Sequence, residues 1–262
     1  MPKMLTFATL KGGVGKSSLT LNITGLLAKE NKNRILVIDA DPQANTSINF
    51  GVSDIQELSI KNIYEEATPL ENIVIESPIS ELPNVDLVPS SILLTTTEFQ
   101  MVTKPARESV LKDYLEQNSK VLDEYTHVII DTNPSMSVIN QTVFNTVDDI
   151  ILVSDVNMNA FKGCMVFCEL WEEIARVLKK PYNVSGFVVN NIDGRTTIAG
   201  EYIDFVTHHS ITKDIYLGSI PSSVKIKQSE LAQLPINLTV SNCELLNRYK
   251  KVYSEMKKRG IV

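Results

Sequence analysis

The segment Lys11-Gly12-Gly13-Val14-Gly15-Lys16-Ser17-Ser18 combines glycines, lysines and hydroxyl side chains within eight positions. Glycines let the backbone turn tightly and present its N–H groups to phosphate oxygens. Lys16 is placed to reach the β- and γ-phosphates of a nucleotide, and Ser17 to bind Mg²⁺. A helix that begins near Lys16 would add its positive N-terminal dipole to the same site. The residue types and their spacing therefore predict a phosphate-binding loop.

This loop differs at one position from the ordinary phosphate-loop pattern G-x-x-x-x-G-K-[ST]. Leu10 stands where that pattern has its first glycine, and Lys11 follows it. A glycine-rich loop without a function, or one that binds another anion, is the alternative interpretation. The eight-residue run between a predicted strand and a predicted helix favours nucleotide binding.

Three aspartates come at the ends of apolar segments that read as strands. Asp39 and Asp41 close the first of these segments, and Asp131 ends the run His-Val-Ile-Ile-Asp. In a doubly wound sheet, the carboxyl ends of the strands line the ligand crevice. We expect Asp41 to orient the attacking water, Asp39 to support Mg²⁺ or the same water network, and Asp131 to act on Mg²⁺ through water. For Asp39 and Asp41, a polar surface turn is the alternative.

Apolar strands and helical patterns alternate along the chain. Continuous apolar strands separated by helices predict one α/β domain over residues 1–262, with a mostly parallel twisted sheet covered by helices on both faces. Residues 51–83 are expected to be loop with one short helix, and Pro105 is expected in the first turn of its helix. The expected strands are 4–9, 34–39, 85–89, 127–131, 149–154, 186–190 and 216–220, and the expected helices are 17–30, 103–124, 163–178, 199–209 and 243–258.

Composition narrows the possible classes of protein. The 262 residues are 43% hydrophobic and 21% charged, which is ordinary for a globular chain, and the net charge of −6 confines any nucleic-acid site to a local basic patch. Cys164, Cys168 and Cys243 lack a zinc-type spacing, so we expect reduced core thiols. No apolar run reaches the roughly 18 residues that span a bilayer. The N-terminus reads as a strand rather than a signal peptide, which predicts a cytoplasmic protein.

The run from Lys11 to Ser18 resembles the deviant Walker A motif of the ParA/MinD family of ATPases. The resemblance implies a single-domain P-loop NTPase fold and Mg²⁺-dependent hydrolysis of ATP, with Lys11, Lys16 and Asp41 as catalytic residues. It also implies a homodimer that sandwiches two ATP molecules, in which Lys11 reaches the phosphates bound by the partner. A cation supplied across an interface stabilises charge on a transferring phosphoryl group, as arginine fingers do.

The resemblance extends from residue 4 to about residue 236, and the run Asp-Pro-Gln-Ala-Asn-Thr-Ser at 41–47 is similar to the ParA branch. By the same resemblance, Asn190 and Pro221 contact adenine. Arg195 and Lys225 match DNA-contacting positions, and Lys227 adjoins Lys225. The chain departs from the family where Asn133 replaces the first of two prolines and where Ser222 replaces an arginine.

A ParA-type chain implies partition of a plasmid or chromosome. The ATP-bound homodimer would bind nonspecific DNA on the nucleoid, and a ParB-like centromere-binding protein would stimulate hydrolysis and release. No membrane contact is expected. One alternative is a MinD-like ATPase that positions membrane or protein cargo through the basic amphipathic segment 243–258. Another is an electron-transfer ATPase similar to nitrogenase iron protein, although Cys164 and Cys168 do not match its cluster ligands.

Overall fold

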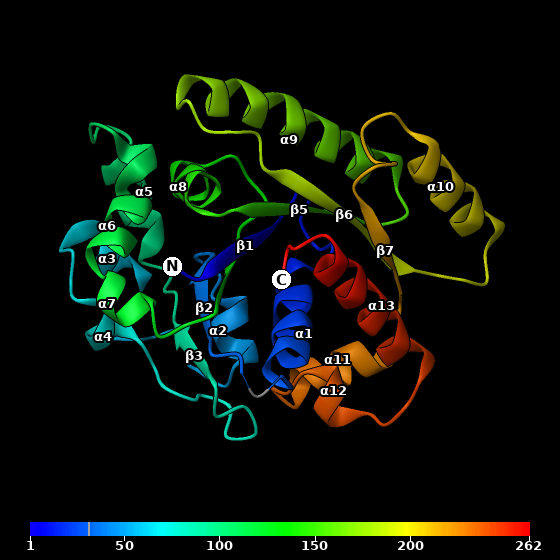
Figure 1. The fold of residues 1–262 in the computed structure, drawn as a ribbon, viewed down its shortest axis with the longest axis horizontal. Helices are drawn as coiled ribbons and strands as arrows, with labels where there is room; N and C mark the ends of the chain where they lie inside the picture. The colour runs from blue at the N-terminus through cyan, green and yellow to red at the C-terminus, as the bar shows by residue number, and fades with distance from the viewer. Residues whose placement is uncertain (31) are drawn as a thin grey trace.

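Seven parallel strands form one sheet in the computed structural model, which describes residues 1–30 and 32–262 (Figure 1). Their order across the sheet is β3-β2-β4-β1-β5-β6-β7. The strands are β1 (Lys3–Ala8), β2 (Ile35–Ala40), β3 (Val85–Val88), β4 (His127–Thr132), β5 (Asp149–Ser154), β6 (Val184–Ile192) and β7 (Tyr216–Pro221). Each of the seven predicted strands is present, and the expected α/β class with its parallel sheet is confirmed.

Helices cover both faces of the sheet (Figure 1). Side chains alternate along each strand, so Met4 and Ala8 of β1 enter one core while Leu5 and Phe7 enter the other. The helices are α1 (Lys16–Ala28), α2 (Asn45–Asn49), α3 (Ile60–Glu65), α4 (Leu70–Ile73), α5 (Leu94–Met101), α6 (Val110–Gln117), α7 (Ser119–Leu122), α8 (Val138–Thr146), α9 (Met158–Val177), α10 (Thr197–His208), α11 (Val224–Leu231), α12 (Ile236–Thr239) and α13 (Glu244–Lys258). The first core joins α3, α6, α8, α9 and α10, and the second joins α1, α12 and α13. Because one core lies on each face of the sheet, successive residues of the interior strands are buried on opposite sides, and most of them are apolar.

The expected helix at 103–124 is interrupted. Ala106 adopts a left-handed φ of 50°, so the chain passes through a 3₁₀ turn (Arg107–Ser109) before α6 begins. Asn118 then separates α6 from α7, and its side-chain amide donates to the carbonyl of Tyr114 at 2.9 Å. Such local hydrogen bonds compete with the helix ladder. The prediction of one helix with Pro105 in its first turn was therefore wrong.

Other boundaries also differ from expectation. The segment 51–83 holds two short helices, α3 and α4, instead of one. The helix expected from residue 163 begins at Met158, because the Asn157 side chain accepts a hydrogen bond from the amide of Asn159 and caps it. Helices α2, α5, α8, α11 and α12 were not predicted. A serine cap marks α8, where the Ser137 hydroxyl accepts from the amide of Asn140.

The C-terminal helix α13 packs on the core. Its apolar side chains are buried against α1 and β7, and they are Leu245, Leu246, Tyr249, Val252 and Met256. The Tyr253 hydroxyl donates to Glu30 at 2.6 Å, which fastens the solvent side of the same helix. With these residues buried, α13 has no free apolar face for a lipid surface. None of the helices described in the structure combines the length and apolarity needed to cross a membrane.

Candidate functional site

The loop between β1 and α1 depends on glycine at two positions. Gly13 and Gly15 have φ values of 78° and 93°, a region that side chains with a Cβ rarely adopt. A Cβ on Gly15 would also lie 2.3 Å from the side-chain nitrogen of Asn190. That nitrogen donates to the carbonyl of Val14 at 2.8 Å, so the end of β6 holds the loop in place.

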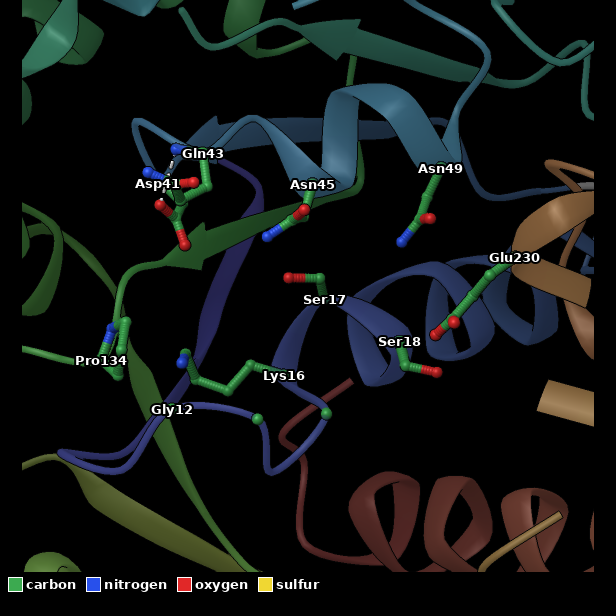
Figure 2. Close-up of a pocket in the computed structure, with 12 residues that line it drawn as sticks. Gly12, Lys16, Ser17, Ser18, Asp41, Gln43, Asn45, Asn49, Pro134 and Glu230 are labelled. Carbon is green, nitrogen blue, oxygen red and sulfur yellow. Dashed lines mark hydrogen bonds between the residues drawn. The ribbon is translucent and has the colours of Figure 1, made fainter. Parts of the chain in front are cut away.

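A cavity of about 400 Å³ opens over this loop (Figure 2). Its walls come from the loop and first turn of α1, from α2 and the residues before it, from the loop after β4 and from α11. The lining residues are Gly12, Gly13, Gly15, Lys16, Ser17, Ser18, Asp41, Gln43, Asn45, Asn49, Pro134 and Glu230. The predicted phosphate loop and Asp41 thus share one cavity. Gln43 and Asn45 belong to the run identified in the sequence, whereas Asn49 and Glu230 gave no sequence signal.

Lys16 lies deep in this cavity and faces two acids. Its side chain is nearly buried, and this burial lowers the pKa of its amine while Asp131 and Asp41 oppose the shift. Asp41 is itself almost buried, and its Oδ1 accepts from the amide of Gln43 at 2.9 Å. A cation and an acid therefore reach the same space from opposite walls, a geometry suited to a phosphate and a water molecule.

Asp39 and Asp131 lie side by side at the ends of β2 and β4, where they are register partners. Both are fully buried. Burial raises the pKa of Asp39, with the neighbouring charge of Asp131 as the second cause; burial also raises the pKa of Asp131, against the pull of Lys16. Two carboxylates held this close without solvent need hydrogen-bond donors to remain ionised.

Helix α2 supplies those donors. The Thr46 hydroxyl donates to Asp131 Oδ2 at 2.6 Å, while the Ser47 amide and hydroxyl donate to Asp39 Oδ2 at 2.7 and 2.8 Å. Asp39 Oδ1 accepts from the amide of Asp41 at 3.1 Å. Both oxygens of Asp39 are thus engaged within the chain, and neither Asp39 nor Asp131 lines the cavity. The expected role of Asp39, to support Mg²⁺ or the same water network, stays a prediction.

The remaining residues suit a magnesium ion held partly by nucleotide and water. Asp131 Oδ1 is buried and has no hydrogen-bond partner within residues 1–30 and 32–262, while Ser17 lies on the cavity wall. In the same described residues, no three His, Cys, Asp or Glu side chains gather into a metal-binding group. Mg²⁺ characteristically keeps several waters and uses one or two protein ligands beside phosphate oxygens. Ser17 and Asp131 therefore fit it.

The loop after β4 is fixed by Asn140 of α8. Its side-chain amide donates to the carbonyls of Asn133 and Ser135 at 2.9 and 2.8 Å. Pro134 between them lies on the rim of the cavity, and its ring is 3.7 Å from a Cβ built on Gly12. The replacement of the first proline by Asn133 is thus accompanied by hydrogen bonds that hold this loop.

Lys11 points away from the cavity that its own loop forms. Its amine lies 3.1 and 3.0 Å from the two carboxylate oxygens of Asp155, which follows β5, and both side chains are about one third exposed. Lys11 is not among the residues that line the cavity. The two lysines of the loop therefore have different surroundings.

The other predicted contacts lie beside the cavity rather than on its wall. Asn190 is buried, and its Oδ1 has no hydrogen-bond partner in the part of the chain that the structure describes. Pro221 ends β7 and pairs with Ile192 of β6. The loops after these two strands are joined where the Ser222 amide donates to the carbonyl of Ile192 at 2.9 Å.

The predicted DNA-contacting residues follow the same two strands. Arg195 is highly exposed and pairs with Asp193 at 2.7 Å. Lys225 and Lys227 are exposed on α11. Arg195 lies between β6 and α10, the two lysines lie on α11 after β7, and none of the three lines the cavity.

None of the residues that line the cavity is a cysteine. Cys164 and Cys168 are buried in the first core, and burial raises the pKa of both thiols. The Cys164 thiol donates to the carbonyl of Val153 at 3.6 Å. Cys164 and Cys168 are therefore free core thiols, as expected, whereas the free thiol of Cys243 is only partly buried, just before α13.

Residues 2–184 match a family model described as "AAA domain". An uncharacterized protein of Mycobacterium tuberculosis is 29% identical over 201 residues, a match that covers 76% of this chain and 61%, about three fifths, of the length of that relative. The chromosome partitioning protein ParA of Caulobacter vibrioides is 26% identical over 254 residues, which cover 97% of this chain and 93% of ParA.

Solved structures share the fold. A plasmid partition protein from Borrelia burgdorferi has a TM-score of 0.75 at 22% identity, covering 98% of this chain and 99% of its own. Cobyrinic acid a,c-diamide synthase from Mycobacterium smegmatis, with a bound ATP analog and magnesium, has a TM-score of 0.81 at 19% identity, covering 99% and 96%. The fold thus serves more than one activity. With its family match, its lysine-bearing loop and its partition-protein relatives, the chain belongs to the AAA-domain family and, within it, to the ParA type of the ParA/MinD group.

Proposed function

We propose that this chain is a DNA-partitioning ATPase that works as an ATP-bound dimer. The observation that carries the proposal is the position of Lys11, whose amine lies outside its own cavity against Asp155. A lysine that contributed only to its own nucleotide would face inward, as Lys16 does. An outward lysine at the cavity rim is suited to a nucleotide held by a second copy of the chain.

The cavity supports hydrolysis of a nucleoside triphosphate. Backbone N–H groups from Gly12 to Ser18 receive the phosphates, and Lys16 neutralises charge on the β- and γ-phosphates. Asp41, held by the amide of Gln43, orients the attacking water. Bound Mg²⁺ supplies Lewis-acid stabilisation of the phosphoryl oxygens. Ser17 and Asp131 hold that ion, and the Asn190 amide and Pro221 flank the adenine.

In this proposal, the dimer is the form that binds DNA. Arg195, Lys225 and Lys227 form a local basic group on a chain whose net charge is −6, and two copies double that group in one particle. Such contacts bind phosphates without reading bases, so affinity falls steeply with salt. The name of the Caulobacter vibrioides relative, a chromosome partitioning protein, supports this assignment.

Hydrolysis then releases the dimer from DNA. A ParB-like centromere-binding protein stimulates this step, and the chain resides on the nucleoid in the cytoplasm without a membrane. The buried apolar face of α13 disfavours the MinD-like alternative, in which the C-terminal helix would lie on lipid.

Sedimentation of the protein with nonspecific DNA tests the proposal. We expect binding with ATP or a slowly hydrolysed analogue, little with ADP, and loss of binding in Lys16→Ala. Asp41→Ala should bind ATP and remain on DNA, since it lacks only the residue that orients water. Equal DNA binding with and without ATP in the wild-type protein would show that the nucleotide does not control the DNA-bound form.

A further inference from the structure

Two adjacent hydroxyls on α2 hold the two buried carboxylates at the sheet edge, but the two contacts are not equivalent. Ser47 donates twice to Asp39, whose second oxygen is taken by a backbone amide. Thr46 donates once to Asp131 at 2.6 Å, and the other oxygen of Asp131 is left without a partner within the described residues. Both carboxylate oxygens of Asp39 therefore accept hydrogen bonds from its own chain. Asp131 has one oxygen that accepts a hydrogen bond and one that has no partner among the described residues.

The Thr46 contact joins α2, which forms part of the cavity wall, to the end of an interior strand. Asp131 ends β4, an interior strand between β2 and β1, while α2 is a five-residue helix whose Asn45 and Asn49 line the cavity. Thr46 and Asp131 are both fully buried, so water does not compete for their hydrogen bond. A change in the direction of the Asp131 carboxylate is thus transmitted to the cavity wall through this one bond.

We propose that Thr46 is a positioning residue that orients Asp131 toward the cation and so couples occupancy of the cation site to the position of α2. The inference rests on the magnesium–nucleotide site proposed above. Thr46 holds Oδ2, which fixes the carboxylate plane and aims Oδ1 at the water shell of the ion. Partners of this outer kind orient ligands, and their loss reduces metal affinity by about 10- to 100-fold.

Thr46→Val tests the inference because valine replaces the hydroxyl with a methyl group of similar volume. Binding of the fluorescent analogue mant-ADP is measured first in EDTA and then over a MgCl₂ titration. We expect unchanged affinity in EDTA and a MgCl₂ midpoint raised by about tenfold or more. Thr46→Ser, which keeps the donor, should restore the wild-type midpoint. ADP keeps the readout independent of hydrolysis and dimer formation.

Hydrogen exchange supplies a second readout. In the wild-type protein, MgCl₂ added to the mant-ADP complex should slow amide exchange over 45–50; in Thr46→Val this response should be lost. Thr212→Val is the matched control, since Thr212 is also fully buried and donates to a carbonyl, that of Val206, in the connection between α10 and β7. It should leave the MgCl₂ midpoint unchanged. Thr46→Ala serves as a second hydroxyl-free variant if the valine variant does not fold.

The possible outcomes separate the two proposals. If wild-type protein binds mant-ADP but Thr46→Val and Thr46→Ala keep its MgCl₂ midpoint, Thr46 has no positioning role and the nucleotide site stands. A midpoint raised equally by serine and valine also overturns the inference, because the hydroxyl would not be the cause. If the wild-type protein binds no mant-ADP with or without MgCl₂, the proposed nucleotide site itself fails.

Discussion

Lys11 is paired with Asp155 in the free subunit. We therefore expect this ion pair to oppose formation of the ATP-dependent dimer. For Lys11 to reach a partner's phosphates, its amine must leave both carboxylate oxygens, which lie 3.1 and 3.0 Å away. Asp155→Asn removes the charge of this partner while keeping its shape. We therefore expect Asp155→Asn to strengthen the ATP-dependent dimer instead of weakening it.

The magnitude follows from the exposure of the pair. Both side chains are about one third exposed, so solvent screens part of the attraction, and the pair is worth about 1 kcal/mol in the free subunit. Each dimer breaks two such pairs, one in each subunit, for a total of about 2 kcal/mol. The dissociation constant of the dimer should then fall by roughly 30-fold.

Sedimentation equilibrium with a slowly hydrolysed ATP analogue measures that constant directly. Asp123→Asn is the control, because Asp123 carries the same charge and pairs with the N-terminal amine at 3.3 Å, before the start of β4. It should leave the dimer unchanged. An Asp155→Asn dimer that is no tighter than wild type would show that Lys11 does not exchange Asp155 for a partner's phosphates.

Three further outcomes are expected. Gly15→Ala should abolish nucleotide binding, measured by mant-ADP fluorescence, because φ is 93° there and a neighbouring amide nitrogen lies 2.3 Å from the new Cβ; unchanged affinity would contradict the loop geometry. Arg195→Ala should weaken DNA binding equally for all sequences and lower the slope of log affinity against log salt by about 1, so a change confined to one sequence would argue for base readout. Glu30 has its pKa lowered by hydrogen bonds from Lys257 and Tyr253. The resulting stability is present above the unfolded carboxyl pKa and is lost as pH falls through the lowered folded value. Glu30→Gln should therefore reduce the loss of stability on acidification, which urea unfolding at several pH values measures, and an identical acid profile would exclude Glu30 as a contributor.

The sheet could be predicted from the sequence because its signals are local. Runs such as 35–38 and 128–130 are apolar at every position, as strands buried on both faces must be. The carboxyl ends of parallel strands share one edge, so Asp41 and Asp131 could be placed beside the phosphate loop before any contact was known. The same argument placed Asp39 correctly at that edge.

The direction in which Asp39 points could not be predicted. It depends on α2, a helix of five residues whose start follows Ala44 at a φ of 53°, and such a turn leaves no periodic pattern. Glu230 reaches the cavity only because α11 lies beside α1 in space, more than 200 residues later in sequence. The interruption of the expected helix at Ala106 could not be predicted either, because the left-handed residue there is an alanine and not a glycine or asparagine. Contacts set by tertiary packing, rather than local preference, account for these differences.

In the proposed dimer, Lys16 neutralises phosphate charge within its own subunit and Lys11 does so in the partner. Lys16 is nearly buried beside Asp41 and Asp131, so its place is set within one chain whether or not a partner is present. Lys11 is paired with Asp155 outside the cavity, and in the proposed dimer the partner's phosphates replace this contact. A single chain therefore has the residues to hold a nucleotide but keeps its second lysine away from it. Since a phosphoryl group in transfer gains most from added positive charge, the proposed mechanism predicts that the free subunit binds nucleotide and that efficient hydrolysis requires the dimer.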